Sequence, residues 1–469
     1  MDYCDRMHEP IFSVVIPTRN RAETLPHAIR SCINQDFAAM EILIVDNASE
    51  PETRFAVEQF TDSRIRYVRH DEPLSMTANW NAALSQTRGE WVCFIGDDDG
   101  LTPGALSRLH TIASSTTCRA MRWDYCVYTW PDFPLSEIAN RLCVTTYADP
   151  DRVCSGMEAL IAMADMPAAG PRGPSVYHGM IHRSLIDEAL ATGPVFQGRI
   201  PDYFSGTLFA ALADSFLQVT FPASIAGLSG KSNGAAHIIK GEANAVRDEF
   251  LQLSLSENLH FHEALPQVNL SCVYISDAVL RIRDRLGLTD PRLSPQPAAI
   301  ADICIRSLWQ TGTLLAEEEA EISRFCEANS VNLSSEQQAA LESPTGVRPP
   351  IFPDNGAVGV SANSVTIDGN ELGLRNLTDA AFASAAINNV GTKFRPIVDR
   401  LTGQLHRQTD LVSIREQETR EVNKQLVSTR KVAAKRQKEL DKIKRSRVWR
   451  ARTKFRKLIS STNSSNVTS

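Results

Sequence analysis

Three consecutive aspartates, Asp97, Asp98 and Asp99, follow an apolar run and are closed by Gly100. Adjacent carboxylates repel one another and are costly to bury, so they are not ordinary core residues. Where a buried strand emerges, such carboxylates suit a divalent cation, because Mg²⁺ takes one or two protein carboxylates together with substrate phosphate oxygens. The triplet alone is also compatible with a solvated acidic turn.

Two other polar clusters follow apolar runs in the same way. Residues 11–16 and 41–45 are short apolar, β-branched runs that read as buried strands. The polar or strand-ending residues that follow them are Pro17, Thr18, Arg19 and Asp46. Three strand ends that each carry polar groups are more informative than the aspartates alone.

Segments with helical spacing alternate with these runs. Strands are predicted over about 11–16, 41–45, 65–69 and 91–95, and helices over about 22–35, 51–60, 77–86 and 103–114. Such alternation predicts an α/β fold with a mainly parallel sheet and helices on both faces. Ligands of open α/β sheets bind beyond the carboxyl ends of the strands. We therefore expect the three polar clusters to meet at one crevice.

The three blocks together resemble the family 2 glycosyltransferases, which have the nucleotide-sugar-binding GT-A fold. Residues 12–21 (FSVVIPTRNR) are similar to the family's opening strand, and residues 41–49 to its second strand. Residues 89–100 are similar to the strand that leads into its DxD metal motif. The clear resemblance covers about residues 11–110 and extends more weakly to about 240.

The resemblance implies a role for each strand end. Asp46 would contact the nucleobase, although an aspartate here could also cap the next helix. Pro17, Thr18, Arg19 and Asp97 would line the nucleotide-sugar donor, although Arg19 could be a solvated turn residue. The metal, Mn²⁺ or Mg²⁺, is assigned to the aspartate triplet and to a histidine late in the domain.

The metal motif departs from the family pattern at one position. Gly96 stands where the family often has its first aspartate, so Asp97, Asp98 and Asp99 compete for the ligand role. Asp98 is the first choice and Asp99 the second. His237, after a Gly/Ser/Asn-rich loop, is the candidate histidine for the metal or diphosphate, although a lone histidine is more often structural.

The catalytic base is assigned to Asp202. This residue follows Pro201 and precedes an apolar helix, at a place similar to the family's catalytic acidic residue. A carboxylate there could take the proton of an acceptor hydroxyl. The alternative is that Asp202 only caps the helix.

The resemblance implies a metal-dependent, inverting glycosyltransferase of bacterial surface-polysaccharide assembly. It would move a sugar from a nucleotide-diphospho-sugar donor to a hydroxyl of a glycan or lipid-linked acceptor. The alternative is a catalytically inactive glycosyltransferase-like scaffold that acts through its helical tail. A nucleotidyltransferase lacks support, because no Gly-rich basic phosphate loop follows the first strand.

The length of 469 residues predicts more than one domain. A helical accessory region could bind the acceptor or form a homo-oligomer, and the sequence does not choose between these roles. The predicted divisions are a GT-A catalytic domain over 1–240, the helical region over 241–342, a linker or irregular region over 343–403, a basic helical tail over 404–459 and a disordered end over 460–469.

The charge distribution sets the tail apart. Residues 420–459 hold 16 Lys and Arg against 3 Asp and Glu, and the rest of the chain holds 33 against 52. The tail is either a weak coiled coil or a single solvated helix. Apolar residues such as Trp449 and Phe455 are interleaved with its basic ones, which suits an anionic membrane surface. The acidic body and the lack of a recognition module argue against nucleic acid as a partner.

The location is predicted from what the sequence lacks. The first residues have no apolar leader, and the ten cysteines show no CxxC pair, which favours a reducing compartment. No run of 18 apolar residues is present. We therefore expect a cytoplasmic protein whose basic tail reaches the inner face of the membrane.

Overall fold

The computed structural model describes residues 9–145, 150–165, 167, 172–232, 245–311, 316–342, 359–360 and 364–388. The chain divides into two units, Met1–Lys393 and Phe394–Ser469, and all described residues belong to the first. The predicted basic tail and His237 lie outside the described residues. The predicted division into domains therefore stays a prediction.

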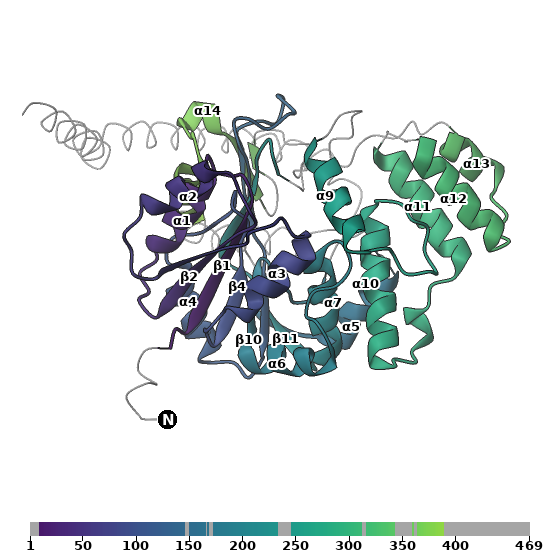
Figure 1. The fold of residues 1–469 in the computed structure, drawn as a ribbon, viewed down its shortest axis with the longest axis horizontal. Coiled ribbons are helices and arrows are strands. Elements are labelled where there is room, and N and C mark those ends of the chain that lie inside the picture. The colour runs from purple at the N-terminus through teal and green to yellow at the C-terminus, as the bar shows by residue number, and fades with distance from the viewer. Residues whose placement is uncertain are drawn as a thin grey trace, which may run out of the picture. The chain divides into compact units, whose positions relative to one another are not determined.

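An eight-stranded sheet, called sheet A, forms the centre of the fold (Figure 1). In spatial order its strands are β3 (Ile65–Arg69), β2 (Met40–Asp46), β1 (Phe12–Thr18), β4 (Trp91–Phe94), β10 (Gly179–His182), β6 (Ala120–Trp123), β11 (Ser215–Val219) and β9 (Arg152–Ser155). The first four run parallel, while β10 and β9 run antiparallel to their neighbours. The predicted α/β class with a mainly parallel sheet is confirmed.

Helices cover both faces of sheet A because alternate residues of each strand point to opposite sides. Val14 and Ile16 of β1 pack against α1 and α4, whereas Val15 between them packs in the cluster formed by α3, α6 and α7. The bounds of the helices around the sheet are α1 (Leu25–Ile33), α2 (Pro51–Glu58), α3 (Met76–Ser85), α4 (Ala105–Ala113), α5 (Gly156–Asp165), α6 (Arg183–Thr192) and α7 (Pro201–Leu212).

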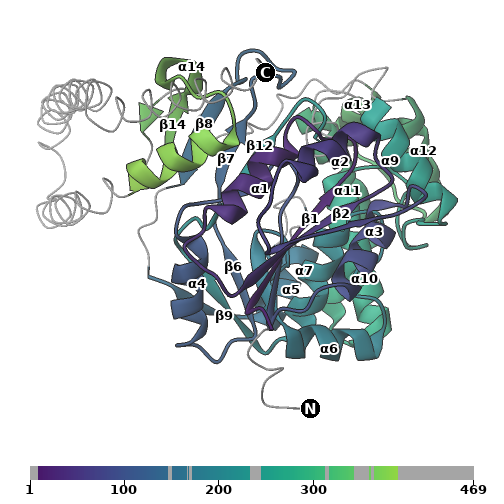
Figure 2. The ribbon, with the colours of Figure 1, turned by 60° about the vertical axis from the view of Figure 1, so that its left-hand side comes forward.

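A second sheet, sheet B, joins segments that are far apart in sequence (Figure 2). Its strands in spatial order are β13 (Gly359–Val360), β14 (Ser364–Asp368), β8 (Arg141–Thr145), β7 (Cys126–Thr129), β12 (Ser224–Leu228) and β5 (Gly100–Leu101). After β14 come α14 (Gly369–Leu372) and helical residues 377–388. Leu377 and Ala381 of this last segment pack with Tyr128 and Leu142 of the sheet.

Within residues 343–403, the described part contains regular secondary structure that is paired with sheet B. β14 pairs with β8 over five residues, and the side chain of Arg141 forms a 2.6 Å ion pair with Asp368. A five-residue strand surrounded by Gly, Ser and Asn cannot be told from a loop by composition. The strand it pairs with, β8, lies more than 200 residues earlier, so no local sequence pattern predicts the pairing.

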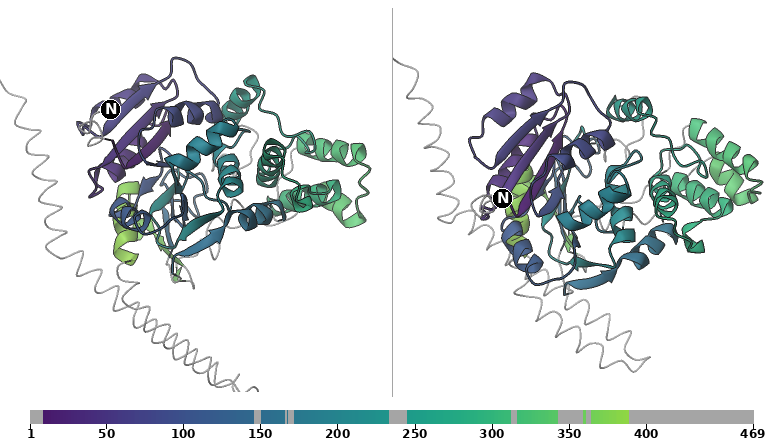
Figure 3. Two further views of the ribbon diagram at one scale, coloured as in Figure 1. Left: turned by 90° about the horizontal axis from the view of Figure 1, so that it is seen from below. Right: turned by 60° about the horizontal axis from the view of Figure 1, so that its bottom comes forward.

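The remaining helices follow later in the chain, and the last four α-helices of this group share an apolar core (Figure 3). They are α9 (Ala245–Ser256), α10 (Ser271–Leu286), the short η3 (Pro291–Leu293), α11 (Pro297–Thr311), α12 (Ala316–Ala328) and α13 (Ser335–Glu342). Within the described ranges, no helix is both long and apolar enough to cross a bilayer.

Candidate functional site

The carboxyl ends of β1, β2 and β4 bring the predicted polar clusters together. The strand register places Thr18 opposite Asp46. The backbone N–H of Arg19 lies 3.4 Å from Oδ2 of Asp97, and Nε of Arg21 lies 3.7 Å from Oδ1 of the same carboxylate. The expected convergence of strand ends is therefore present in the structure.

Asp99 is held by hydrogen bonds within the protein. Its Oδ2 accepts from the backbone N–H of Gly96 at 2.7 Å and from the hydroxyl of Tyr177 at 2.6 Å. Its Oδ1 accepts from the backbone N–H of Gly227 at 2.7 Å. The residue is 1% exposed. This carboxylate joins β4 to β10 and β12, so its predicted role as a metal ligand is the weaker of the two aspartate assignments.

The same turn explains why glycine replaces the family's first aspartate. A Cβ on Gly96 would lie 2.9 Å from Oδ2 of Asp99 and 3.2 Å from Oδ1 of Asp98. On the other side, a Cβ on Gly227 would lie 1.7 Å from the backbone oxygen of Asp98. The aspartate turn is thus clamped between two glycines, and an aspartate side chain at position 96 has no room.

Asp98 and Asp97 are the carboxylates with remaining capacity to bind a cation. Oδ2 of Asp98 accepts from the hydroxyl of Ser229 at 2.6 Å, and no described residue donates a hydrogen bond to its Oδ1. Burial, with the charge of Asp99, raises the pKa of Asp98 to about 6. Burial also raises the pKa of Asp97 to about 6, against the opposing charge of Arg21.

These two carboxylates fit a divalent cation of the Mg²⁺ type. A cation nearby would offset the burial and repulsion that raise both pKa values. No group of three or more His, Cys, Asp and Glu side chains suited to a metal occurs in the described part of the chain. Mg²⁺ does not need such a group, since it is usually bound through one or two carboxylates plus substrate phosphates and water.

Asp46 lies at the predicted place, but both of its oxygens are engaged. Oδ1 accepts from the backbone N–H of Ser49 at 2.8 Å, and Oδ2 accepts from the hydroxyl of Tyr67. Nε of Arg69 lies 3.8 Å from Oδ2, and Asp46 is fully buried. Burial and this carboxylate raise the pKa of Tyr67. In this arrangement Asp46 fastens the end of β2 to β3 and presents no open oxygen to a base.

Two arginines follow β1, and the sequence singled out only the first. The guanidinium of Arg19 donates to the backbone oxygen of Asn47 at 2.6 Å and forms a 2.5 Å ion pair with Glu249 of α9. Arg21 instead turns toward the aspartates, because Asn20 between them adopts a left-handed conformation with φ of 56°. Thr18 is buried and Pro17 is half-buried at the same strand end.

Asp202 is the second residue of α7 and not its cap. The cap position is Ile200, and Pro201 begins the helix. The backbone N–H groups of Asp202 and Tyr203 act to lower the pKa of the carboxyl. Burial nevertheless raises the pKa of Asp202 to about 6. A half-buried carboxylate that ionises near this pH suits a general base.

The side chain of Tyr177 contacts the aspartate turn through its hydroxyl. Burial raises the pKa of Tyr177, and the charges of Asp99, Asp98 and Asp202 raise it further. The centre of its ring lies 4.2 Å from that of His178. Tyr177 is not among the site residues predicted from the sequence, because apolar residues surround it there.

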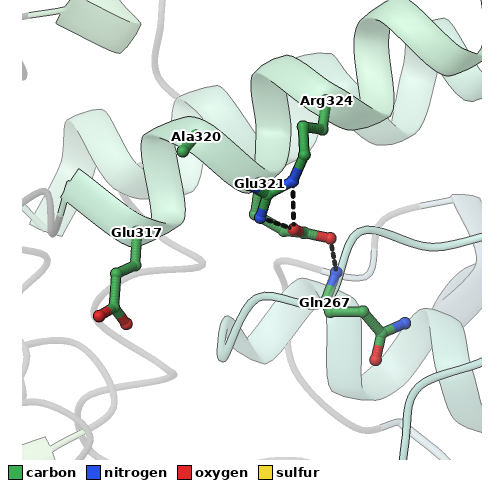
Figure 4. A pocket seen from close by; sticks show the side chains of 5 residues that line it. All are labelled: Gln267, Glu317, Ala320, Glu321 and Arg324. Atoms are coloured by element: carbon green, nitrogen blue, oxygen red, sulfur yellow. Dashed lines mark hydrogen bonds and ion pairs between the residues drawn. The ribbon is translucent and has the colours of Figure 1, made fainter.

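A pocket elsewhere in the chain has no connection to these groups. It is lined by α12 and by the segment before α10 (Figure 4). There Oε1 of Glu321 accepts from the backbone N–H of Gln267 at 3.0 Å, and Arg324 pairs with the same carboxylate. None of the sequence-predicted site residues lines it.

The strand-end half of the site lies inside a recognised family segment. Residues 13–136 match the family model described as glycosyl transferase family 2. This segment is similar to family 2 glycosyltransferases. It includes both strand-end arginines and the whole aspartate turn, whereas Tyr177 and Asp202 come after it.

Curated relatives are similar to the chain over about 100 residues. A GalNAc(5)-diNAcBac-PP-undecaprenol beta-1,3-glucosyltransferase of Campylobacter jejuni is 42% identical over 103 residues, which are 21% of this chain and 33% of that protein. An Escherichia coli UDP-Glc:alpha-D-GlcNAc-diphosphoundecaprenol beta-1,3-glucosyltransferase, WfgD, is 31% identical over 93 residues, or 20% and 37% of the two chains. The alignments thus span about a third of these relatives.

Solved structures match a longer part of the chain, but at lower sequence identity. S. aureus TarS in complex with UDP-GlcNAc is 13% identical with a TM-score of 0.44, covering 70% of this chain and 86% of that one. The mannosyltransferase PcManGT from Pyrobaculum calidifontis, in complex with GDP-Man and Mn2+, is 16% identical with a TM-score of 0.39, covering 81% and 87%.

Proposed function

We propose that the protein is a metal-dependent, inverting glycosyltransferase that uses a nucleotide-diphospho-sugar donor. The observation that carries the proposal is the pairing of Asp97 and Asp98 with Arg21 at the carboxyl ends of β1 and β4, inside the family 2 segment. A bound diphosphate needs positive charge around it. The carboxylates can hold a cation that binds its oxygens, and the guanidinium can bind them directly.

The donor would bind through the strand ends. Arg21 would face the diphosphate, and Arg19 would reach it after releasing Glu249. Asp98, assisted by Asp97, would hold Mn²⁺ or Mg²⁺, which when bound supplies Lewis-acid stabilisation of the departing nucleoside diphosphate. Asp46 would support the nucleotide side by fixing β2 and β3, with Pro17 and Thr18 forming the floor beside it. His237 stays a second candidate for the cation or diphosphate.

The transfer itself would be a single displacement. The acceptor hydroxyl oxygen forms a bond to the anomeric carbon on the face opposite the bond to the diphosphate, which breaks. Asp202 takes the hydroxyl proton, and the nucleoside diphosphate leaves with the bonding electrons. Asp202 suits this role because its carboxylate is half-buried and its pKa is raised to about 6, so it is ionised and weakly basic at neutral pH.

The acceptor would be a glycan or a lipid-linked sugar in surface-polysaccharide assembly. Both named relatives act on sugars linked through a diphosphate to undecaprenol. The basic tail would bring the enzyme to an anionic membrane, where such acceptors reside. Self-association through the helical region is a further role for residues 241–342.

The test uses the purified full chain with UDP-glucose, UDP-GlcNAc or GDP-mannose and Mn²⁺. A short-chain polyprenyl-diphosphate-linked GlcNAc is the acceptor, and the readouts are nucleoside diphosphate release and glycosylated lipid. We expect turnover with one donor, its loss with EDTA, and its return with added Mn²⁺.

The Asp98→Asn variant should lose this turnover. The control is Asp187→Asn, which changes an exposed carboxylate on α6. Absence of donor binding and turnover in the folded wild-type protein would support the inactive scaffold instead. Full activity in the presence of EDTA would remove the metal from the proposal.

A further inference from the structure

An exposed aromatic residue, Tyr125, lies close to the aspartate turn. It connects β6 to β7 and is 40% exposed. Its ring stacks on that of His178, with ring centres 4.2 Å apart and an angle of 25°. His178 therefore contacts one face of the ring.

Several contacts hold His178 and the backbone of Tyr125 in place. His178 has a left-handed backbone with φ of 49°, and its Nδ1 lies 2.8 Å from the hydroxyl of Ser224. Its Nε2 lies 3.9 Å from Oδ2 of Asp99. The backbone oxygen of Tyr125 accepts a 2.8 Å hydrogen bond from the hydroxyl of Thr145. Strained backbone that the surroundings hold in place is a feature of functional sites.

The imidazole is a neutral support and not a charged one. Burial lowers the pKa of His178 to about 3. A neutral ring that is fixed by Ser224 can stack on Tyr125 at all physiological pH values. His178 therefore connects the buried aspartate turn to the exposed ring of Tyr125, and the group that stacks on this ring is not a cation.

The segment that supports Tyr125 also reaches the candidate base. Tyr177, next to His178, donates a 2.6 Å hydrogen bond from its hydroxyl to Oδ2 of Asp99. Ser175, in the same segment, has its hydroxyl 3.4 Å from the backbone oxygen of Asp202 at the start of α7. The stack on His178 thus places the ring of Tyr125 beside a segment that contacts both the aspartate turn and the residue that would take the acceptor proton.

We propose that Tyr125 is the platform on which the acceptor's pyranose ring stacks, placing a hydroxyl toward Asp202. The inference rests on the proposed function and adds a residue that selects the acceptor. One face of a pyranose is lined by C–H groups, so it matches a flat aromatic surface, while its hydroxyls need polar neighbours. The exposed carboxylate of Asp124, the residue before Tyr125, would supply such a neighbour.

The test compares Tyr125→Ala with Tyr125→Phe, which keeps the ring. Phe55→Ala is the matched control, because it removes another exposed aromatic ring, 59% exposed, from α2. Thermal unfolding establishes that each variant is folded. The first measurement is the KM for the polyprenyl-diphosphate-linked GlcNAc and the KM for the nucleotide-sugar donor.

For Tyr125→Ala we expect the acceptor KM to rise about tenfold, the size of one lost stacking contact. The donor KM should change much less. Tyr125→Phe should remain within about twofold of wild type, as should Phe55→Ala. An unchanged acceptor KM in Tyr125→Ala would overturn the proposal. A donor KM that rises as much as the acceptor KM would also overturn it, since the ring would then bind the donor sugar.

A second measurement does not depend on turnover. Saturation-transfer NMR is recorded with methyl glycosides of glucose, galactose, GlcNAc and GalNAc. We expect a signal from at least one glycoside that Tyr125→Ala loses and Tyr125→Phe keeps. Such binding in a protein without transfer activity would reject the proposed function but retain the sugar platform. A wild-type signal that Tyr125→Ala retains, or no signal from any of the four, would reject the platform.

Discussion

The hydroxyl of Tyr177 donates a 2.6 Å hydrogen bond to Oδ2 of Asp99. The bond links the aspartate turn after β4 to the segment that enters β10, some 78 residues later in the chain. The three neighbouring aspartates therefore differ in role. Asp99 connects strands through hydrogen bonds, while Asp97 and Asp98 remain able to bind a cation.

Substitution should therefore affect Asp98 and Asp99 differently. Asp99→Asn places an amide where two donors, the N–H of Gly96 and the hydroxyl of Tyr177, need an acceptor, or else leaves the Gly227 N–H unpaired. We expect a loss of about 1–3 kcal/mol in the free energy of unfolding, measured in urea. Asp98→Asn should lower stability less and abolish cation-dependent turnover. The assignment would be wrong if Asp99→Asn kept full stability while losing Mn²⁺ dependence.

Asp202→Asn should lower the turnover rate by about 10²- to 10⁴-fold, as expected for loss of a general base. The base works only when ionised, so the wild-type rate should rise as pH increases through about 6 and then level off. The variant's residual rate should lack this rise. A pH–rate profile from pH 5 to 8 measures it, and an unchanged rise in the variant would exclude Asp202 as the base.

The same residue gives a test that needs no substrate. Because the folded-state pKa is raised above the usual value of 3.8, the folded protein binds this proton more tightly than the unfolded chain does. The stability from this group is therefore present below pH 4 and is lost as pH rises toward 6. We expect Asp202→Asn to raise the melting temperature at pH 7.5 relative to wild type, with the difference shrinking at pH 4. A lower melting temperature at pH 7.5 would contradict this account.

Gly227→Ala should damage the aspartate turn, because its Cβ would lie 1.7 Å from the backbone oxygen of Asp98. Neither atom can move without disturbing β12, so we expect a loss of about 1–3 kcal/mol in unfolding free energy. Gly206→Ala in α7 is the control, since its nearest contact would be an ordinary 3.7 Å. That variant should be neutral or more stable by up to about 1 kcal/mol. Equal effects of the two substitutions would mean that the turn tolerates displacement.

The basic tail leads to a prediction on membranes. In the full chain, replacing Lys454, Arg456 and Lys457 with glutamine should weaken sedimentation with phosphatidylglycerol vesicles on the order of 100-fold, at about 1 kcal/mol per charge. Added salt should weaken wild-type binding in the same direction. Vesicles of neutral phosphatidylcholine are the control. Equal binding of wild type to both vesicle types would reject an electrostatic role for the tail.

The sequence was sufficient for the half of the site that lies on parallel strands. Apolar runs that end in Arg19, Asp46 and Asp98 carry their own signal, because strand direction alone brings the ends together. The clamp around the turn was not predictable in this way. Tyr177, Gly227 and Ser229 reach it from segments 78 to 131 residues away, through antiparallel pairing and crossovers that no local pattern encodes.

Finer roles also needed the structure. Asp46 carries the expected residue type at the expected place, yet Ser49 and Tyr67 occupy its oxygens. Arg21 was passed over because only the left-handed turn at Asn20 reveals which of two neighbouring arginines faces the aspartates.

The pairing of β14 with β8 has a consequence for how the protein is made. Arg141 lies opposite Asp368, so sheet B cannot be completed until more than 200 further residues have left the ribosome. Until then the edge of β8 that pairs with β14 stays exposed, as do the apolar residues of the sheet that the later segment covers. Exposed strand edges of this kind favour aggregation. A gene fragment that stops near residue 240 would leave every copy permanently in that state. Any expression design for this protein should therefore extend at least through residue 388.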